Sequence, residues 1–226
     1  SSLGKTEDFG AEYNFYTDTE LAQLTADLFP AEAPSLDTLL TTRRPNILVI
    51  IMESFGARYI GALGGMAEVS PRFDRLSKEG ILFSSCYANS FRTDLSGYPS
   101  FPPPSVMKPP AKIRSLSALS GELRKQGYTT DFLYGGDANF TNMKGYLLGS
   151  GYQRVTDEKD LDKRLPRTNW GVPDGVTFDY LYGEILRQPT DKPWHKGFLT
   201  LSSHEPFDVP YKRLASPIPN AFAYLD

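Results

Sequence analysis

The chain has 226 residues, of which 40% are hydrophobic and 13% aromatic, and its formal net charge is −3. This length and apolar content predict a folded domain with a packed core and exclude general disorder. The mildly acidic balance argues against broad electrostatic binding to nucleic acid, so we expect no nucleic-acid partner. Because the chain contains only Cys86, His195 and His204 as soft ligands, any metal site must rely mainly on carboxylate and hydroxyl oxygens.

The first part of the chain, residues 1–44, is predicted to be a helical connector arm. The run Thr17-Asp18-Thr19-Glu20 forms a capping box, in which a hydroxyl and a carboxylate three residues apart satisfy free backbone amides. Leucines then recur at helical spacing as far as Leu28, and Pro30 ends the run. The arm carries no catalytic pattern, so we expect it to pack on the main domain.

Strand and helix patterns alternate through residues 45–226, the predicted main domain. Residues Asn46–Met52 are apolar at successive positions, which predicts a strand buried on both faces of a sheet. The further predicted elements are a helix capped by Ser70 that ends at Gly80, a strand at Ile81–Phe83, a helix at Ser115–Gln126, a strand at Tyr128–Tyr134, a helix at Phe178–Leu186 and a strand at Gly197–Ser202. This alternation predicts an α/β fold in which helices flank a mainly parallel central sheet.

Polar residues follow several of these predicted strands. Glu53 comes directly after the first strand, Thr93 lies in the segment after the second, and His204 follows the last. Ligands of open α/β sheets gather beyond the carboxyl ends of the strands, so these residues are candidates for one site. Each has a simpler explanation as well, because such a carboxylate can cap the next helix and a single histidine is often structural.

Five segments, taken in order, resemble the alkaline phosphatase/sulfatase superfamily. These segments are Asn46–Phe55, Ser70–Gly80, Phe83–Ala88, Phe91–Asp94 and Leu201–Phe207. Two more, Tyr134–Met143 and Trp170–Tyr180, are similar to the lipoteichoic acid synthase-like branch of phosphoglycerol and phosphoethanolamine transferases. The resemblance covers residues 45–226 and implies a sulfatase-like catalytic domain there.

The resemblance also implies roles for individual residues. Glu53 matches a metal-binding carboxylate, Thr93 matches the nucleophile that also ligates the metal, and His204 matches a histidine that contacts the phosphate or head group. The pocket residues that match less closely are Arg92, Arg164 and Trp170. The implied cofactor is a divalent metal ion, with manganese expected first and zinc or magnesium as alternatives.

The implied chemistry is consistent with these residue types. A threonine hydroxyl is a poor nucleophile until its proton is removed, and a divalent cation lowers its pKa and polarises the phosphoryl oxygens. The resemblance therefore implies a transferase that moves a phosphoglycerol-type head group from a lipid-linked phosphodiester donor to a hydroxylated acceptor. The head group would pass through a phospho-threonine intermediate.

Other functions remain open. A phosphodiesterase or other hydrolase of the same superfamily would use the same residues with water as acceptor, and a degenerate domain would bind glycerophosphate without catalysis. A true sulfatase is disfavoured, because the Cys/Ser-x-Pro-x-Arg motif that it needs does not occur near Thr93 or at Cys86.

The chain departs from the pattern at the metal site. Relatives usually complete that site with an Asp-His pair, and neither histidine here follows an aspartate. We therefore expect the domain to be incomplete at its C-terminal end, and this chain taken by itself to be inactive and metal-free. Relatives are also usually anchored by membrane helices, so we expect an extracytoplasmic catalytic domain at the cell membrane, anchored by helices absent from this chain.

Overall fold

A computed structural model of the chain describes residues 14–28, 40–87 and 118–226, and it divides into two compact units, Ser1–Arg43 and Arg44–Asp226. The first unit contains helix α2 (Asp18–Leu28). Its capping box is confirmed, because Thr17 N donates to Glu20 Oε2 at 2.8 Å and Glu20 N donates to Thr17 Oγ1 at 3.3 Å.

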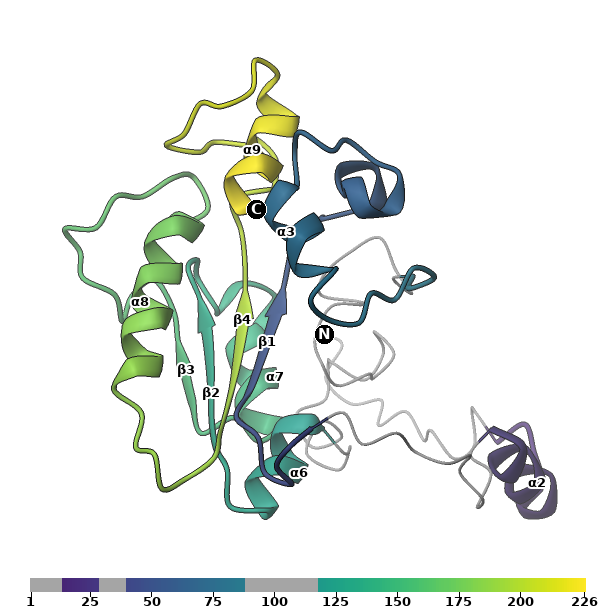
Figure 1. Cartoon of the computed structure of the whole chain (residues 1–226). Helices are drawn as coiled ribbons and strands as arrows, with labels where there is room; N and C mark the ends of the chain where they lie inside the picture. Colours follow the sequence, from purple (N-terminus) through teal and green to yellow (C-terminus); the bar gives the residue numbers. More distant parts are fainter. Residues whose placement is uncertain (1–13, 29–39, 88–117) are drawn as a thin grey trace, which may run out of the picture. The chain divides into compact units, whose positions relative to one another are not determined.

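The second unit is built on a parallel sheet of four strands, which confirms the predicted α/β class (Figure 1). The strands lie in the order β1-β4-β2-β3. Their bounds are β1 Ile47–Ile51, β2 Thr129–Tyr134, β3 Arg154–Thr156 and β4 Trp194–Leu199. Parallel pairing brings the carboxyl ends of all four strands to one edge of the sheet.

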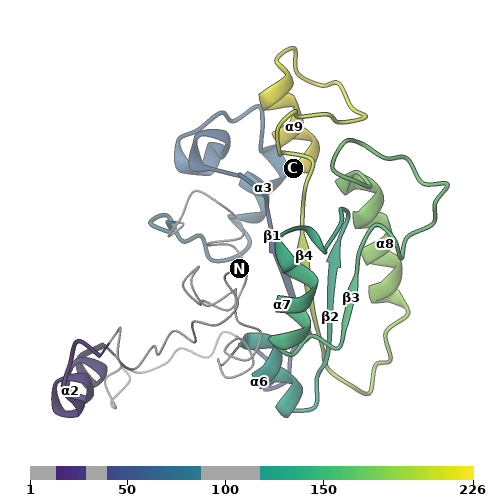
Figure 2. The ribbon, with the colours of Figure 1, turned by 180° about the vertical axis from the view of Figure 1, so that it is seen from behind.

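Helices cover both faces of this sheet. Helix α8 (Asp174–Leu186) packs on one face, while α6 (Leu119–Lys125) and α7 (Met143–Gly149) pack on the other, as the two opposite views show (Figures 1 and 2). On the α8 side, the rings of Phe178 and Phe198 meet edge to face with centroids 4.8 Å apart. The larger core cluster, on the α7 side, includes Phe132, Tyr146, Leu147 and Leu199.

Strand β4 carries polar residues inside the sheet. All six of its residues are buried, including His195 and Lys196. The His195 ring lies 3.0 Å from Tyr152 Oη through Nε2 and 3.3 Å from the Ile47 carbonyl oxygen through Nδ1. The Lys196 ammonium donates to Asp131 Oδ2 at 2.9 Å. The strand prediction at Gly197–Ser202 therefore started too late, because polar residues with buried partners hid the first half of the strand.

The strand predicted at Asn46–Met52 is confirmed as β1, but its predicted burial on both faces and the strand predicted at Ile81–Phe83 are wrong. Strand β1 lies at the edge of the described sheet, and in it Leu48 is 39% and Ile50 is 40% exposed. No strand forms at Ile81–Phe83, whose two outer side chains are 63% and 74% exposed. Apolar residues alone made that segment look like a strand, but it is not hydrogen-bonded into the described sheet.

The segments beyond the carboxyl edge form a separate apolar cluster (Figure 1). Helices α3 (Pro71–Leu76) and α9 (Pro217–Leu225) meet there with the short 3-10 helices η1 (Ala57–Tyr59) and η2 (Gly61–Leu63). The Tyr59 and Phe222 rings stack with centroids 3.9 Å apart. The cap of α3 differs from the predicted one. Ser70 Oγ accepts from Gly61 N and donates to Asp74 Oδ1 instead of capping the helix. The Asp226 carboxylate accepts hydrogen bonds from the amides of Arg72 and Phe73 at the start of the helix.

Candidate active site

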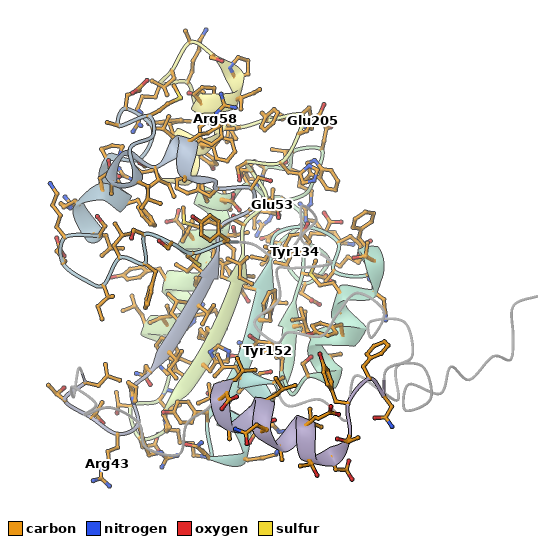
Figure 3. The ribbon with its side chains drawn as sticks, turned by 90° about the vertical axis from the view of Figure 1, so that its right-hand side faces the viewer. Arg43, Glu53, Arg58, Tyr134, Tyr152 and Glu205 are labelled. Atoms are coloured by element: carbon orange, nitrogen blue, oxygen red, sulfur yellow. The ribbon has the colours of Figure 1, made fainter. Side chains whose placement is uncertain are left out.

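The candidate site lies at the carboxyl edge of the sheet. Ile51, Leu199 and Tyr134, the last residues of three adjacent strands, are neighbours in register. Glu53 follows β1 by two residues, and Figure 3 shows its side chain beside that of Tyr134, with Tyr152 towards the opposite end of the strands. The prediction that Glu53 lies just beyond a strand end is therefore confirmed.

The backbone of Glu53 is fixed by the segment that follows β4. Its N–H donates to Thr200 Oγ1 at 2.8 Å, and its carbonyl oxygen accepts a short hydrogen bond from Ser203 Oγ. Its carboxylate accepts from Ser54 Oγ at 2.9 Å, and Ser54 has a left-handed φ of 55°. A non-glycine residue in that region is held by its surroundings, so the backbone turn that follows Glu53 is fixed.

Asp174 holds the same segment from the other side. This residue starts α8 and is 1% exposed, and its carboxylate accepts from Leu201 N at 3.0 Å and from Ser202 N at 2.7 Å. Its own N–H donates to Ser202 Oγ at 3.0 Å. Burial raises the pKa of the Asp174 carboxyl to about 6, in opposition to these hydrogen bonds and with a further contribution from the charge of Glu53. The carboxyl is therefore ionised at pH 7.5.

Tyr134, the last residue of β2, lies close enough to both carboxylates to feel their charge. Burial, followed by the negative charges of Glu53 and Asp174, raises the pKa of its phenol to about 12. The phenol is therefore neutral throughout the physiological pH range. It can donate a hydrogen bond, but it cannot serve as a base.

An aromatic wall, defined here as Trp170, His204 and Phe140, stands next to this edge. The ring centroids of Trp170 and His204 are 4.2 Å apart, and Phe140, in the 3-10 helix η4 (Phe140–Asn142), meets Trp170 edge to face at 6.2 Å. Trp170 Nε1 donates to the Glu205 carbonyl oxygen at 2.5 Å, and His204 Nδ1 lies 2.9 Å from the same oxygen. Because a carbonyl only accepts, Nδ1 carries the proton, which leaves Nε2 available to a substrate.

Glycines allow Trp170 to reach this position. Gly171 has a φ of 133°, and a Cβ there would lie 2.2 Å from the Gly135 carbonyl oxygen. A Cβ on Gly136 would lie 2.6 Å from the Trp170 carbonyl oxygen. Any larger side chain would push the Trp170 segment away from the end of β2.

The other predicted site residues are placed differently. Arg164 is exposed and bound to Asp162 through two nitrogens, with its Nη2 2.6 Å from Oδ2. In the part of the chain that the structure describes, Arg164 forms no hydrogen bond or ion pair with Glu53, His204 or Trp170. Arg92 and the predicted nucleophile Thr93 lie outside the described residues.

A metal site is not complete in the described part of the chain. Residues 14–28, 40–87 and 118–226 contain no group of three or more His, Cys, Asp or Glu side chains that could hold a metal ion. Glu53 is the only predicted ligand among them. The second predicted ligand, Thr93, lies outside the described residues, so no step below is derived through a metal.

The Sulfatase family model matches residues 45–217, which is more than half of the chain. The chain belongs to the Sulfatase family. This confirms the superfamily that the sequence segments predict, and the matched range includes Glu53, Trp170 and His204.

Solved structures agree with this assignment. A protein of the alkaline phosphatase superfamily from Vibrio parahaemolyticus is 28% identical with a TM-score of 0.68, and the match covers 82% of this chain and 48% of that protein. The lipoteichoic acid synthase LtaP from Listeria monocytogenes is 17% identical with a TM-score of 0.63, and the match covers 90% of this chain and 55% of LtaP. The periplasmic domain of EptC from Escherichia coli, in complex with Zn, is 18% identical with a TM-score of 0.56, and the match covers 81% of this chain and 57% of the EptC chain. The chain thus spans about half the length of these structures.

Sequence reasoning named Glu53, His204 and Trp170 but gave no role to Asp174 or Tyr134. Asp174 does have a signal, because it stands four residues before the predicted start of the helix and directly after Pro173, where a carboxylate often caps a helix. Its bonds to the segment after β4 join positions far apart in the sequence. That part of its role needed the structure.

Proposed function

We propose that this chain carries the nucleophile-bearing part of a phosphotransferase domain. The enzyme moves a phosphoglycerol-type head group from a lipid donor to a hydroxylated acceptor, through a phospho-threonine at Thr93. The observation that carries the proposal is the connection of Glu53 to the segment that bears His204 and its aromatic wall, at the carboxyl edge of a Sulfatase-family sheet. The structural similarity to the lipoteichoic acid synthase LtaP supports the choice of reaction class.

The reaction consists of two displacements. In the first, Thr93 Oγ1 attacks the donor phosphorus, the P–O bond to the lipid alcohol breaks, Thr93 loses its proton, and the lipid alcohol leaves with one. In the second, the acceptor hydroxyl attacks the same phosphorus, loses its proton, and the Thr93 hydroxyl is restored. Water in the second step would give hydrolysis instead.

The described residues contribute binding and orientation. The Nε2 of His204 faces away from its Glu205 contact, so it can take up a proton or, when the ring is charged, donate to a phosphate oxygen. The faces of Trp170 and Phe140 offer apolar surface to the carbon skeleton of a head group. The bonds to the Glu53 backbone hold this residue at the end of β1, which reduces the reorganisation needed to place its carboxylate.

A divalent cation belongs to this proposal, with manganese tested first and zinc or magnesium next. It would lower the pKa of the Thr93 hydroxyl and neutralise phosphoryl charge. In this chain, we propose Glu53 and Thr93 as its ligands. We also propose that the domain works outside the cytoplasm at the cell membrane, and the structurally similar domain of EptC, which is periplasmic, supports this. No helix in the described residues is long and apolar enough to cross a bilayer.

The test compares the natural full-length protein with Thr93→Ala and Thr93→Ser on phosphatidylglycerol vesicles that contain manganese. The expected result is turnover by wild type, at least a hundredfold loss for Thr93→Ala, and partial activity for Thr93→Ser, which keeps a hydroxyl. Equal turnover by wild type and Thr93→Ala would overturn the proposal. Products analysed with and without a hydroxylated acceptor distinguish transfer from hydrolysis.

A further inference from the structure

Asp174 is a buried carboxylate to which the proposed chemistry gives no role. It lies at the start of α8, on a different element from Glu53 and His204, and it is 1% exposed. A buried carboxylate is costly unless it is fully hydrogen-bonded, so its partners show what it does. Its carboxylate is hydrogen-bonded to the amides of Leu201 and Ser202, which belong to the segment that follows β4.

We propose that Asp174 is a positioning residue that sets the geometry of Glu53 and His204 together. This inference rests on the proposed function for its catalytic consequence. Its structural part concerns only residues Thr200–His204, which we call the 200–204 turn. This part can be tested without measuring enzyme activity.

The first step of the argument is how Asp174 holds the turn. The two carboxylate oxygens accept from two successive amides, with Leu201 N 3.0 Å from Oδ1 and 3.2 Å from Oδ2, and Ser202 N 2.7 Å from Oδ2. Ser202 Oγ accepts in return from Asp174 N at 3.0 Å. Charge-assisted bonds of this kind are stronger than neutral ones, and the reciprocal bond fixes both the position and the rotation of the turn.

The second step is what the turn holds. Thr200 Oγ1 accepts from Glu53 N, and Ser203 Oγ donates to the Glu53 carbonyl oxygen. The turn also places His204, whose N–H donates to the Leu201 carbonyl oxygen at 3.0 Å. The two residues that Asp174 holds therefore lie between the two that bond Glu53, and one of them also bonds His204, so a shift of the turn would move both proposed functional groups together.

The third step is why a carboxylate is needed. An asparagine in this place would keep one oxygen acceptor, but it would turn an NH₂ donor towards amides that are themselves donors. Asp174→Asn is nearly isosteric, so it removes one or two hydrogen bonds without creating a cavity. Its effect should be concentrated in the 200–204 turn and should spare the sheet.

The first test needs no activity. Hydrogen exchange is followed for the natural full-length protein and for Asp174→Asn, with Asp179→Asn as the control on an exposed position of the same helix. The expected result is at least a tenfold faster exchange of the Leu201 and Ser202 amides in Asp174→Asn, with Phe198 in β4 unchanged. Unchanged exchange of the turn, or equal acceleration throughout the sheet, would overturn the proposal.

The second test uses kcat/KM on the same donor vesicles. Asp174→Asn is expected to lower kcat/KM at least tenfold when His204 is present but less than threefold in a His204→Ala background. Asp174 acts on His204 through the 200–204 turn, so the losses caused by the two substitutions should not add. Equal losses in both backgrounds would overturn the catalytic part of the inference. Failure of the proposed function is a separate result, since it appears as equal turnover by wild type and Thr93→Ala.

A milder variant covers the case in which Asp174→Asn does not fold. Ser202→Ala removes only the acceptor of the Asp174 N–H and leaves the carboxylate bonds in place. It should raise the hydrogen-exchange rate of the amide at position 202 by a smaller factor, about threefold, and leave the exchange rate of the Phe198 amide unchanged. No change in the turn for this folded variant would also contradict the proposal.

Discussion

The ion pair between Lys196 and Asp131 allows a sharp prediction about stability. The Lys196 side chain is 3% exposed within β4, and its ammonium lies 2.9 Å from Asp131 Oδ2. The same oxygen accepts from Arg154 at 3.2 Å, and Arg154 also bonds Glu184 at 2.6 Å. Removing the two members of the pair should therefore have unequal effects. Only the loss of the carboxylate leaves a buried charge without its partner, since Asp131 is 20% exposed and keeps Arg154.

The expected magnitudes follow from that asymmetry. Asp131→Ala should lower the free energy of unfolding by about 3 kcal/mol. This value is at the low end for a broken buried ion pair, because the negative charge of Glu184 still acts on Lys196. Lys196→Met should cost only about 1 kcal/mol, because a straight apolar chain replaces the stem without a charge. The double variant should be more stable than Asp131→Ala alone.

The assay is urea unfolding of the chain followed by circular dichroism, with equal m-values as the check that the variants are comparable. Wild type, both single variants and the double variant form a complete cycle. The reasoning is refuted if Lys196→Met is as destabilising as Asp131→Ala, or if the double variant is less stable than Asp131→Ala.

Two further predictions concern buried rings. Burial lowers the pKa of His195 from its ordinary value of 6.5, so the stability linked to its neutral form is complete above that value and is lost as the pH falls. Between pH 7.5 and 5.5, wild type should lose about 1 kcal/mol more unfolding free energy than His195→Gln; equal losses would contradict this. Trp170→Phe removes the hydrogen bond from the indole to the Glu205 carbonyl oxygen, which keeps its contact with His204. We expect a loss of about 1 kcal/mol of transition-state stabilisation, which is about a fivefold drop in kcat/KM. An unchanged kcat/KM would show that the indole N–H does not position the aromatic wall.

The parallel sheet could be predicted from the sequence because apolar runs mark β1 and β2 and glycines or polar residues end them. Helix α8 was also recognised, although it begins at Asp174, four residues before the predicted start at Phe178. Strand β3 was not predicted, since three residues give too little pattern to detect. The first half of β4 was missed because the partners that make Lys196 tolerable there come from β2.

The candidate site was predictable only in part. Glu53 and His204 could be placed beyond strand ends, because that placement follows from the order of elements along the chain. The contact between His204 and Trp170 and the bonds of Asp174 depend on tertiary folding. Arg164, which the family resemblance suggested as a pocket residue, pairs with Asp162 on the surface, and its role in the pocket stays a prediction.

The most direct test of the central claim is to look for the covalent intermediate. The natural full-length protein is mixed with a phosphatidylglycerol donor and manganese, quenched in acid, digested and examined by mass spectrometry, with Glu53→Gln as a matched control. We predict a glycerophosphoryl group on the peptide that contains Thr93, lost when a hydroxylated acceptor is added and absent or strongly reduced in Glu53→Gln. Turnover of the donor with Thr93 unmodified, or with the group on another residue, would contradict the account.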